Sequence, residues 1–427
     1  MRIMNPLCSL LIVAALCFGP VYAGADELYP SLHHITGDWA GHRTTLHEAG
    51  VQVGLTYTAE PAVLASGGYE SGDTYLHNIN ASLRLDLEKL IKIPRTTFLA
   101  KYSSRSGDNL SEEYVVPAFA EDGRYIYGEY FNKSQEAFGG QTTKLVNFQF
   151  TTEVGDFLSV DYGRLVMNDI FLRSDLYCNF MNNAICGSPK GVFTPYALNA
   201  YPDATAGIHT AWRAGDGLEL RVGVFDGGWT EQNTDGWDWS LGNNGTVVAA
   251  ELQYYFDRAE SGGTQNVIKL GVNHHAGDFN NLRTGEMTEG HTSFWLLADW
   301  MLYREENSMS QGLATFGSVV VNDDDEISAL PVIYTLGFIY EGLIPTRDRD
   351  KLGLMITYAE HSEHNTYTHD FVSGIERGNE ALAEITYNFI LGYGIELMPS
   401  AQFISNPNGS EEFSDVTVFG LKFNVNL

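Results

Sequence analysis

Basic residues and long apolar runs are both scarce in this 427-residue chain. Lys and Arg number 25 against 54 Asp and Glu, so the formal net charge is −29. A negative surplus of this size excludes nucleic acid as the natural partner, because the phosphate backbone would be repelled. After the first two dozen residues, no stretch approaches the ~20 consecutive apolar residues that a membrane helix needs. The mature chain is therefore either a soluble protein or a membrane β-barrel.

Cysteine is equally scarce, and motifs for catalysis are absent. Two of the four cysteines lie near the N-terminus, which leaves Cys178 and Cys186 as an isolated pair. In an exported protein such a pair favours a disulfide over free thiols, and without neighbouring histidines it makes a poor zinc site. The sequence contains no nucleophile motif, phosphate-binding glycine loop or metalloprotease helix. We therefore expect no enzyme activity, no metal and no cofactor.

Residues 1–23 have the pattern of a secretory signal peptide. Arg2 gives a positive start, a short apolar core follows, and small residues stand at Ala23 and Ala25. Cleavage is expected after residue 23, with residue 25 as the alternative. A membrane anchor is disfavoured because the apolar core is shorter than the ~20 residues of a span. Residues 24–50 are expected to form an N-terminal periplasmic segment with a short helix.

From residue 51 to residue 427 the chain alternates apolar and polar residues in short runs. Strict alternation places successive side chains on opposite faces of a strand. We count about sixteen such runs, near 51–60, 75–87, 96–105, 142–152, 157–165, 205–213, 217–226, 246–256, 266–276, 292–303, 312–321, 332–341, 351–359, 380–389, 394–404 and 415–427. An even number of long amphipathic runs favours an all-β transmembrane antiparallel barrel over a soluble sandwich.

The connections between the runs also alternate in length. Short, turn-forming connections follow the even-numbered runs, whereas longer polar connections follow several odd-numbered runs, at 106–141, 166–204, 227–245 and 360–379. Outer-membrane barrels have short periplasmic turns and longer external loops. The last run ends the chain on a strand with an apolar row, which allows it to pair with the first strand and remove the open sheet edges. Both chain ends are thereby predicted on the periplasmic side.

The stretch from 167 to 204 differs from the rest of the chain because it does not alternate. It contains Cys178 and Cys186, and it follows the fifth run, which makes it part of the third external loop. A long segment braced by a disulfide between two wall strands has to lie across the barrel. We expect this loop to fold into the mouth or lumen and to narrow the pore.

Several stretches, taken in order, resemble the bacterial carbohydrate-selective porin family: 35–57, 171–189, 294–319, 334–362 and 403–410. The chain departs from the family pattern at Trp300, which follows Asp299, and at its last residue, Leu427, where an aromatic residue is usual. The resemblance implies sixteen strands, an inward loop and passive diffusion of small sugars such as glucose into the periplasm. A general diffusion porin and, less favoured, a barrel enzyme acting at the rim remain open as alternatives.

Alternation directs charged side chains of both signs toward the lumen, where a neutral sugar needs donors, acceptors and an aromatic face. We favour Arg84, Arg105 and Arg221 as donors, with Glu251 and Asp299 as acceptors. The other candidates are Lys101, Glu219, Arg164, which has the wrong parity unless Gly163 forms a bulge, and the loop residues Asp175, Tyr177 and Asn179. The alternative is that such wall residues pair with one another. The expected partners are neutral carbohydrates, outer-membrane lipid and lipopolysaccharide, and the barrel is expected as a monomer or a homotrimer.

A histidine cluster in the connection after the thirteenth run is the remaining candidate for a metal site. His361, His364 and His369 stand there beside two glutamates, but their spacing matches no ligand motif. We therefore expect these side chains to be solvated on an external loop.

Overall fold

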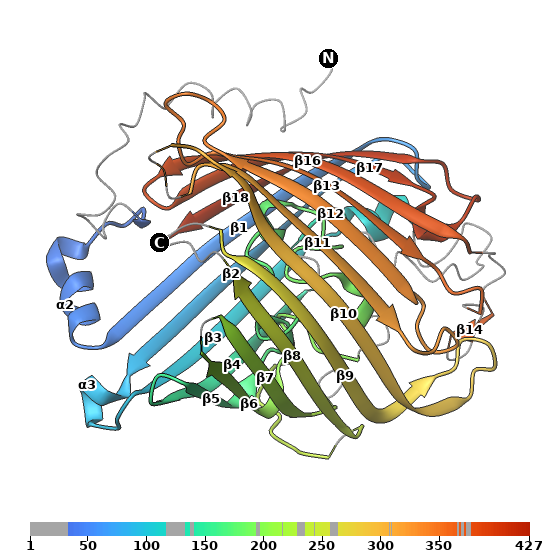
Figure 1. Ribbon diagram of the computed structural model, residues 1–427. Helices are drawn as coiled ribbons and strands as arrows, with labels where there is room; N and C mark the ends of the chain where they lie inside the picture. Colours follow the sequence, from blue (N-terminus) through green and yellow to red (C-terminus); the bar gives the residue numbers. More distant parts are fainter. Residues whose placement is uncertain are drawn as a thin grey trace.

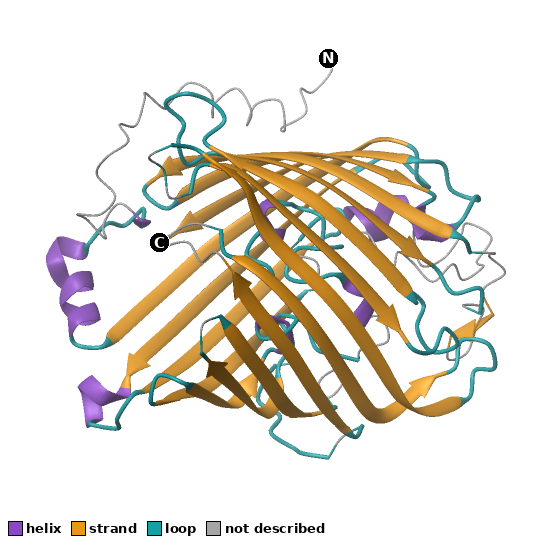
Figure 2. Ribbon diagram, in the orientation of Figure 1, coloured by secondary structure: helices purple, strands orange, loops and turns teal. Residues whose placement is uncertain are grey.

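The chain folds into a single closed barrel, seen in the computed structural model (Figures 1 and 2). The structure describes residues 33–116, 133–136, 141–193, 197–215, 217–228, 235–242, 244–256, 264–306, 308, 310–364, 367–368, 371–372 and 377–427. The expected signal peptide lies outside these residues and stays a prediction. Among the described helices, none is long and apolar enough to cross a membrane.

Sixteen antiparallel strands form the wall, as the alternating runs predict. They are β1(Val51–Ser66), β2(Asp73–Asp86), β3(Thr96–Gly107), β4(Thr142–Val154), β5(Leu158–Leu165), β6(Thr205–Ala214), β7(Leu218–Asp226), β8(Thr246–Phe256), β9(Asn266–Asn280), β10(Met287–Arg304), β11(Gly312–Asn322), β12(Val332–Glu341), β13(Lys351–Glu360), β16(Asn379–Gly392), β17(Ile395–Ser405) and β18(Val416–Asn426). Two further strands, β14(Tyr367–Thr368) and β15(Phe371–Val372), pair only with each other.

The wall closes where the last strand pairs with the first. β18 runs antiparallel to β1 from Thr56↔Asn426 to Ser66↔Thr417, and Thr58 Oγ1 donates to Asn424 Oδ1 at 2.7 Å. Every other wall strand pairs with its two neighbours along the chain. Closure gives each strand two partners, so the sheet has no unpaired edge to expose.

The first described residues lie beside this seam and contact the C-terminus, and a short helix precedes β1. The helix α2(His42–Glu48) begins where Asp38 Oδ1 accepts hydrogen bonds from the backbone N–H and the hydroxyl of Thr44, both at 2.9 Å. Arg43 Nη2 donates to the Leu427 carbonyl at 3.0 Å, and the Ile35 N–H donates to the Asn426 carbonyl at 2.8 Å. A second short helix, α3(Leu87–Ile91), lies in the β2–β3 connection (Figure 1).

Polarity is inverted relative to a soluble protein. Outward side chains on the strands are apolar and exposed, such as Ile208 at 50% and Ile356 at 57%, whereas many inward side chains are polar and buried. An apolar outer face suits a lipid environment and a polar inner face suits water.

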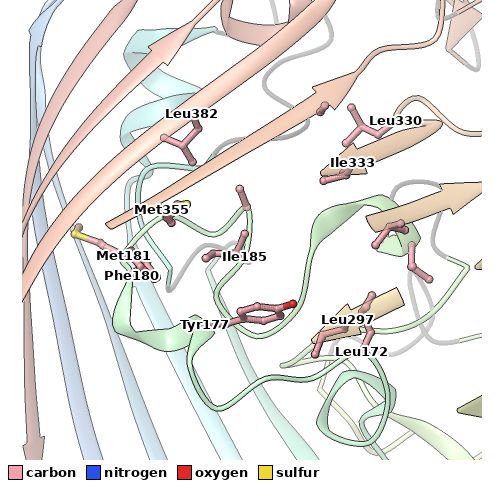
Figure 3. Packing of buried hydrophobic residues seen from close by; sticks show 14 of the residues in the cluster. Leu172, Tyr177, Phe180, Met181, Ile185, Leu297, Leu330, Ile333, Met355 and Leu382 are labelled. Atoms are coloured by element: carbon pink, nitrogen blue, oxygen red, sulfur yellow. The ribbon is translucent and has the colours of Figure 1, made fainter. Parts of the chain in front are cut away.

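The apolar core lies inside the barrel, between the wall and the long β5–β6 connection, which we call the inward loop (residues 166–204, of which 194–196 are not described). Figure 1 shows this loop within the barrel. The fully buried Tyr177, Phe180 and Met181 of the loop lie in the same cluster as the wall residues Leu297 and Met355 (Figure 3). Burial of such side chains stabilises by roughly 1.5–3 kcal/mol each, so the loop is held as a domain core is held.

Glycines on the wall make room for aromatic rings that support the loop. Phe316 of β11 lies over Gly337 of β12, where an added Cβ would be 2.1 Å from the ring. The same Phe316 ring meets Tyr177 at 5.3 Å and Phe180 at 5.7 Å between centroids. Gly337 therefore sets the position of a ring on which the inward loop packs.

We expect Gly337→Val to lower the free energy of unfolding by about 1–3 kcal/mol, because the new side chain forces Phe316 out of its place. Urea unfolding followed by tryptophan fluorescence in detergent measures this. Gly317→Val on β11 is the matched control, since its Cβ would lie 3.4 Å from the nearest atom, an ordinary contact. Equal losses in the two variants would contradict the role given to Gly337.

Candidate functional site

The candidate site is the lumen beside the inward loop. The loop leaves β5, passes through three short turns, η4(Met167–Asp169), η5(Tyr177–Asn179) and η6(Lys190–Phe193), and returns to β6. Its apolar residues pack toward the wall, whereas Asp169, Arg173 and Asp175 remain exposed. The loop thus has one face fixed to the barrel and one face turned to water.

Three buried carboxylates of the wall bind the loop. Glu251 accepts the Leu172 N–H at 2.9 Å through the same oxygen that accepts the Trp295 indole N–H at 2.6 Å. Asp299 accepts the Ser174 hydroxyl at 2.8 Å. Hydrogen bonds to charged acceptors contribute about 1.5–3 kcal/mol each. Glu251 and Asp299, expected as solute acceptors, are therefore occupied as anchors of the loop.

Glu384 of β16 makes the third of these contacts. Its two carboxylate oxygens accept the backbone N–H groups of Met181 at 2.8 Å and Asn182 at 3.1 Å, and Ser400 Oγ donates to it at 2.6 Å. Its side chain is 1% exposed. Because the buried N–H groups of a loop without regular structure need acceptors, this carboxylate serves as their cap.

Wall donors bind the carbonyls of the same loop. Arg221 Nη1 donates to the Ile170 carbonyl at 2.7 Å, Thr386 Oγ1 donates to the Asn179 carbonyl at 2.7 Å, and Lys269 Nζ donates to the Arg173 carbonyl. The wall therefore offers the loop backbone both acceptors and donors. Arg221 of β7, which was also expected to donate to a solute, therefore donates to the loop backbone.

The two cysteines form the disulfide that their isolation predicts, with Cα atoms 4.6 Å apart. The bridge encloses Phe180, Met181 and Asn182, which pack in the core or bind Glu384 and Gln402. Among the described residues, the Glu136 carboxylate lies with both sulfurs within 4.8 Å. Because the sulfurs are oxidised, they offer no thiolate pair to a metal.

The loop candidates occupy different places. The Tyr177 ring is fully buried against Phe316, and burial raises the pKa of its hydroxyl well above the usual value. Asn179 is buried too, and its amide donates to the Leu176 carbonyl at 2.9 Å. The expectation that Tyr177 offers a stacking face to a solute is therefore wrong. Asp175 is exposed and pairs with Arg173 at 3.0 Å.

Two basic side chains of β3 share one aromatic ring of the inward loop. Lys101 Nζ lies 4.3 Å and Arg105 Cζ 4.8 Å from the centroid of the Tyr201 ring. The Tyr201 hydroxyl donates to Asn80 Oδ1 of β2. Tyr201 is absent from the sequence-based candidates, because nothing in a non-alternating segment indicates which aromatic residue turns toward the wall. Cation–π contacts of this kind contribute about 0.5–2 kcal/mol.

Other wall candidates divide between paired and open positions. Glu219 accepts from Arg221 at 2.7 Å and lies 3.6 Å from Arg213, so mutual pairing, the alternative for wall charges, applies to Glu219. Arg84 is exposed two residues before the end of β2, far along the strand from the Asn80 contact with Tyr201.

In the loop, burial together with repulsion from Lys133 and Arg105 lowers the pKa of Lys190 to about 7.

Arg164 lies on the outside of the barrel. Pairing between β4 and β5 runs without a shift through Phe150↔Tyr162 and Phe148↔Arg164, so Gly163 forms no bulge. Tyr162 is 41% exposed on the outer face, and Leu165 points into the core. The prediction that Arg164 lines the pore is therefore wrong, because strict alternation directs its side chain away from the lumen.

The histidine cluster is also placed differently from the expectation. His361 is fully buried and its Nε2 lies 3.0 Å from Glu380 Oε2. Burial and the nearby Arg377 lower the pKa of His361 to about 3, so the ring is neutral at pH 7. His361 follows β13 directly and contacts Glu380 of β16. The expectation that its ring is solvated is wrong. His364 is partly buried, and His369 lies outside the described residues.

We expect Glu384→Ala to release the disulfide-bridged part of the loop, because two backbone N–H groups lose their acceptor at about 1–3 kcal/mol each. Single-channel conductance in planar bilayers should rise and become noisier. Glu153→Ala is the matched control, because it removes one lumen carboxylate that pairs with Arg213 of the wall at 3.2 Å. A conductance change of the same size in both variants would assign the effect to charge alone.

Removing the bridge with Cys178→Ser and Cys186→Ser should also raise the conductance. A short disulfide-closed loop contributes roughly 2–4 kcal/mol of stability, and its loss loosens the segment that Glu384 holds. Trypsin cleavage at the exposed Arg173, followed by mass spectrometry, gives an independent measure of loosening. Unchanged conductance with unchanged cleavage would place the pair away from the narrowest point.

Comparison with known proteins gives consistent matches along the chain. Residues 70–427 match the model of the carbohydrate-selective porin family OprB. Porin B of Pseudomonas aeruginosa is 24% identical over 449 residues, covering 97% of this chain and 95% of that protein. The high-pH structure of Pseudomonas putida OprB superposes with a TM-score of 0.82 at 22% identity, covering 93% of this chain and 99% of that one. Its low-pH structure gives 0.60 at 18% identity, covering 92% and 98%. The chain belongs to the carbohydrate-selective porin family, OprB.

Proposed function

We propose that this protein carries small neutral carbohydrates, glucose among them, across the outer membrane into the periplasm by passive diffusion. Family membership implies a channel in the outer membrane rather than an enzyme. The observation that carries the proposal is the inward loop, which packs its apolar side chains against the wall and leaves Asp169, Arg173 and Asp175 exposed. A barrel narrowed in this way brings a passing solute close to the side chains that line the passage.

The groups that border the open side suit a hydroxyl-rich neutral solute. Lys101 is partly exposed beside the Tyr201 ring, and the exposed Arg173–Asp175 pair on the loop supplies a donor and an acceptor. Hydroxyl groups donate and accept, and the C–H face of a sugar ring packs on aromatic surface. Binding has to stay weak for the solute to leave, which agrees with exposed pairs rather than a closed pocket.

The arrangement of the connections supports one orientation of the barrel in the outer membrane. Residues 35–43 and the C-terminus meet at one rim, and the long connections, including the inward loop, emerge from the other. In outer-membrane barrels the long connections are external. Monomer and homotrimer are both compatible with the proposal, because each barrel contains its own lumen and loop.

Liposome swelling with purified protein tests the selectivity. Glucose and small oligosaccharides should enter faster than an amino acid of similar size, with glucose about 10-fold faster, a difference of ~1.4 kcal/mol. Charged solutes of matched size serve as controls for a simple electrostatic filter. Equal rates for glucose and the amino acid would indicate a general diffusion porin instead.

A further inference from the structure

The part of the β7–β8 connection that the structure describes, residues 235–242, lies against the outside of the barrel. The Leu145 N–H of β4 donates to the Asp235 carbonyl at 2.9 Å. β5 pairs with β4 only as far as Phe148↔Arg164, so Leu145 lies beyond the end of β5. An added Cβ at Gly236, where φ is +80°, would lie 2.0 Å from the Leu145 carbonyl oxygen. The segment is therefore docked closely on the wall.

An aromatic contact extends this docking along the outer face. The Trp239 ring meets the Phe148 ring edge-on at 5.5 Å and 88°. Phe148 belongs to an outward row in which Phe98 lies at 4.8 Å and Phe150 at 6.1 Å. Edge-to-face pairs add about 0.5–1.5 kcal/mol to simple burial. Trp239 thus continues the lipid-facing surface of the wall beyond the ends of the strands.

The segment turns large apolar side chains outward. Trp237 is 58% exposed, Trp239 43% and Leu241 70%. Neighbouring side chains of the lipid-facing wall have similar exposure, with Tyr162 at 41% and Ile208 at 50%. Tryptophan is enriched where membrane lipid meets water, because its ring is apolar and its N–H is polar.

Three backbone donors of the segment bind aspartates of the segment and of β7. The Trp237 N–H donates to Asp235 Oδ1 at 2.9 Å, the Ser240 N–H donates to Asp238 Oδ1 at 2.9 Å, and the Gly242 N–H donates to Asp226 Oδ2. These turns fix the course of the segment, and beside lipid they leave these three donors paired, where an unpaired donor costs several kcal/mol.

Arg164 is enclosed between the wall and this segment. Its Nη1 donates to the Asp238 carbonyl at 3.1 Å, its Nη2 donates to the Ala204 carbonyl at 2.7 Å, and the residue is 2% exposed. The Trp239 ring lies 5.9 Å from its Cζ. A cation on the outer face of a barrel has to be paired and shielded from lipid, and the segment provides both.

We propose that residues 235–242 form a membrane anchor that places Trp237, Trp239 and Leu241 among the lipids of the outer leaflet. The partner is lipid rather than a second copy of the chain, because the exposed side chains continue an apolar surface that surrounds the barrel. The carboxylates of Asp235 and Asp238 stay at the level of the headgroups, where water and cations reach them.

Nitroxide labelling of Leu241→Cys in the full chain, with the native disulfide intact, tests the anchor in reconstituted membranes. Oxygen partitions into lipid and a nickel chelate into water, so their ratio of spin-relaxation effects reports the surroundings of the label. Ile208→Cys is the control on the lipid-facing wall, and Ser71→Cys in the exposed β1–β2 loop is the control in water.

We expect the oxygen-to-nickel ratio at Leu241 to exceed that at Ser71 at least five-fold and to approach that at Ile208. A label at Trp237→Cys should behave in the same way, which guards against a local effect of one substitution. A ratio equal to that of Ser71 at both positions would overturn the proposal. Exclusion of both reagents together with spin–spin broadening would also overturn it, in favour of an interface between copies.

Discussion

The backbone of the inward loop has to find hydrogen-bond partners within the barrel, and much of the lumen follows from this requirement. The loop has no regular sheet or helix over most of its length, so its peptide groups are not satisfied internally. Glu251, Glu384 and Arg221 bind them from three different strands. Charged residues that line the wall are therefore part of the fold first, and only the groups left uncovered remain for a solute.

The inward loop is held by two kinds of contact. In the apolar core, Tyr177 and Phe180 of the loop pack on Phe316 of β11. On β3, Lys101 and Arg105 contact the Tyr201 ring of the same loop. Contacts of both kinds hold the loop in one position, because packed cores resist continuous deformation.

The wall was predictable from the sequence, whereas the partners of its side chains were not. Alternation fixes the face of a strand residue, so the inward direction of Glu251 and Asp299 follows from parity, as does the outward direction of Arg164. Parity contains no information on what occupies the space opposite. Glu251 meets Leu172, 79 residues away in the chain, and the burial of Tyr177 depends on a ring in β11. These contacts are made by a loop whose sequence does not alternate, so alternation could not predict them.

The contacts of Ile35 and Arg43 with the C-terminus have a consequence for the durability of the barrel. Arg43 and Ile35 bind the backbone of the last two residues, so the two strands of the seam are tethered at one rim. If β1 and β18 part at the opposite rim, the tether keeps their registers aligned, and pairing resumes from a fixed origin. Re-closure then requires closing a short loop, a process much faster than the encounter of free edges. The tethered rim thus fixes the register in which β1 and β18 pair again.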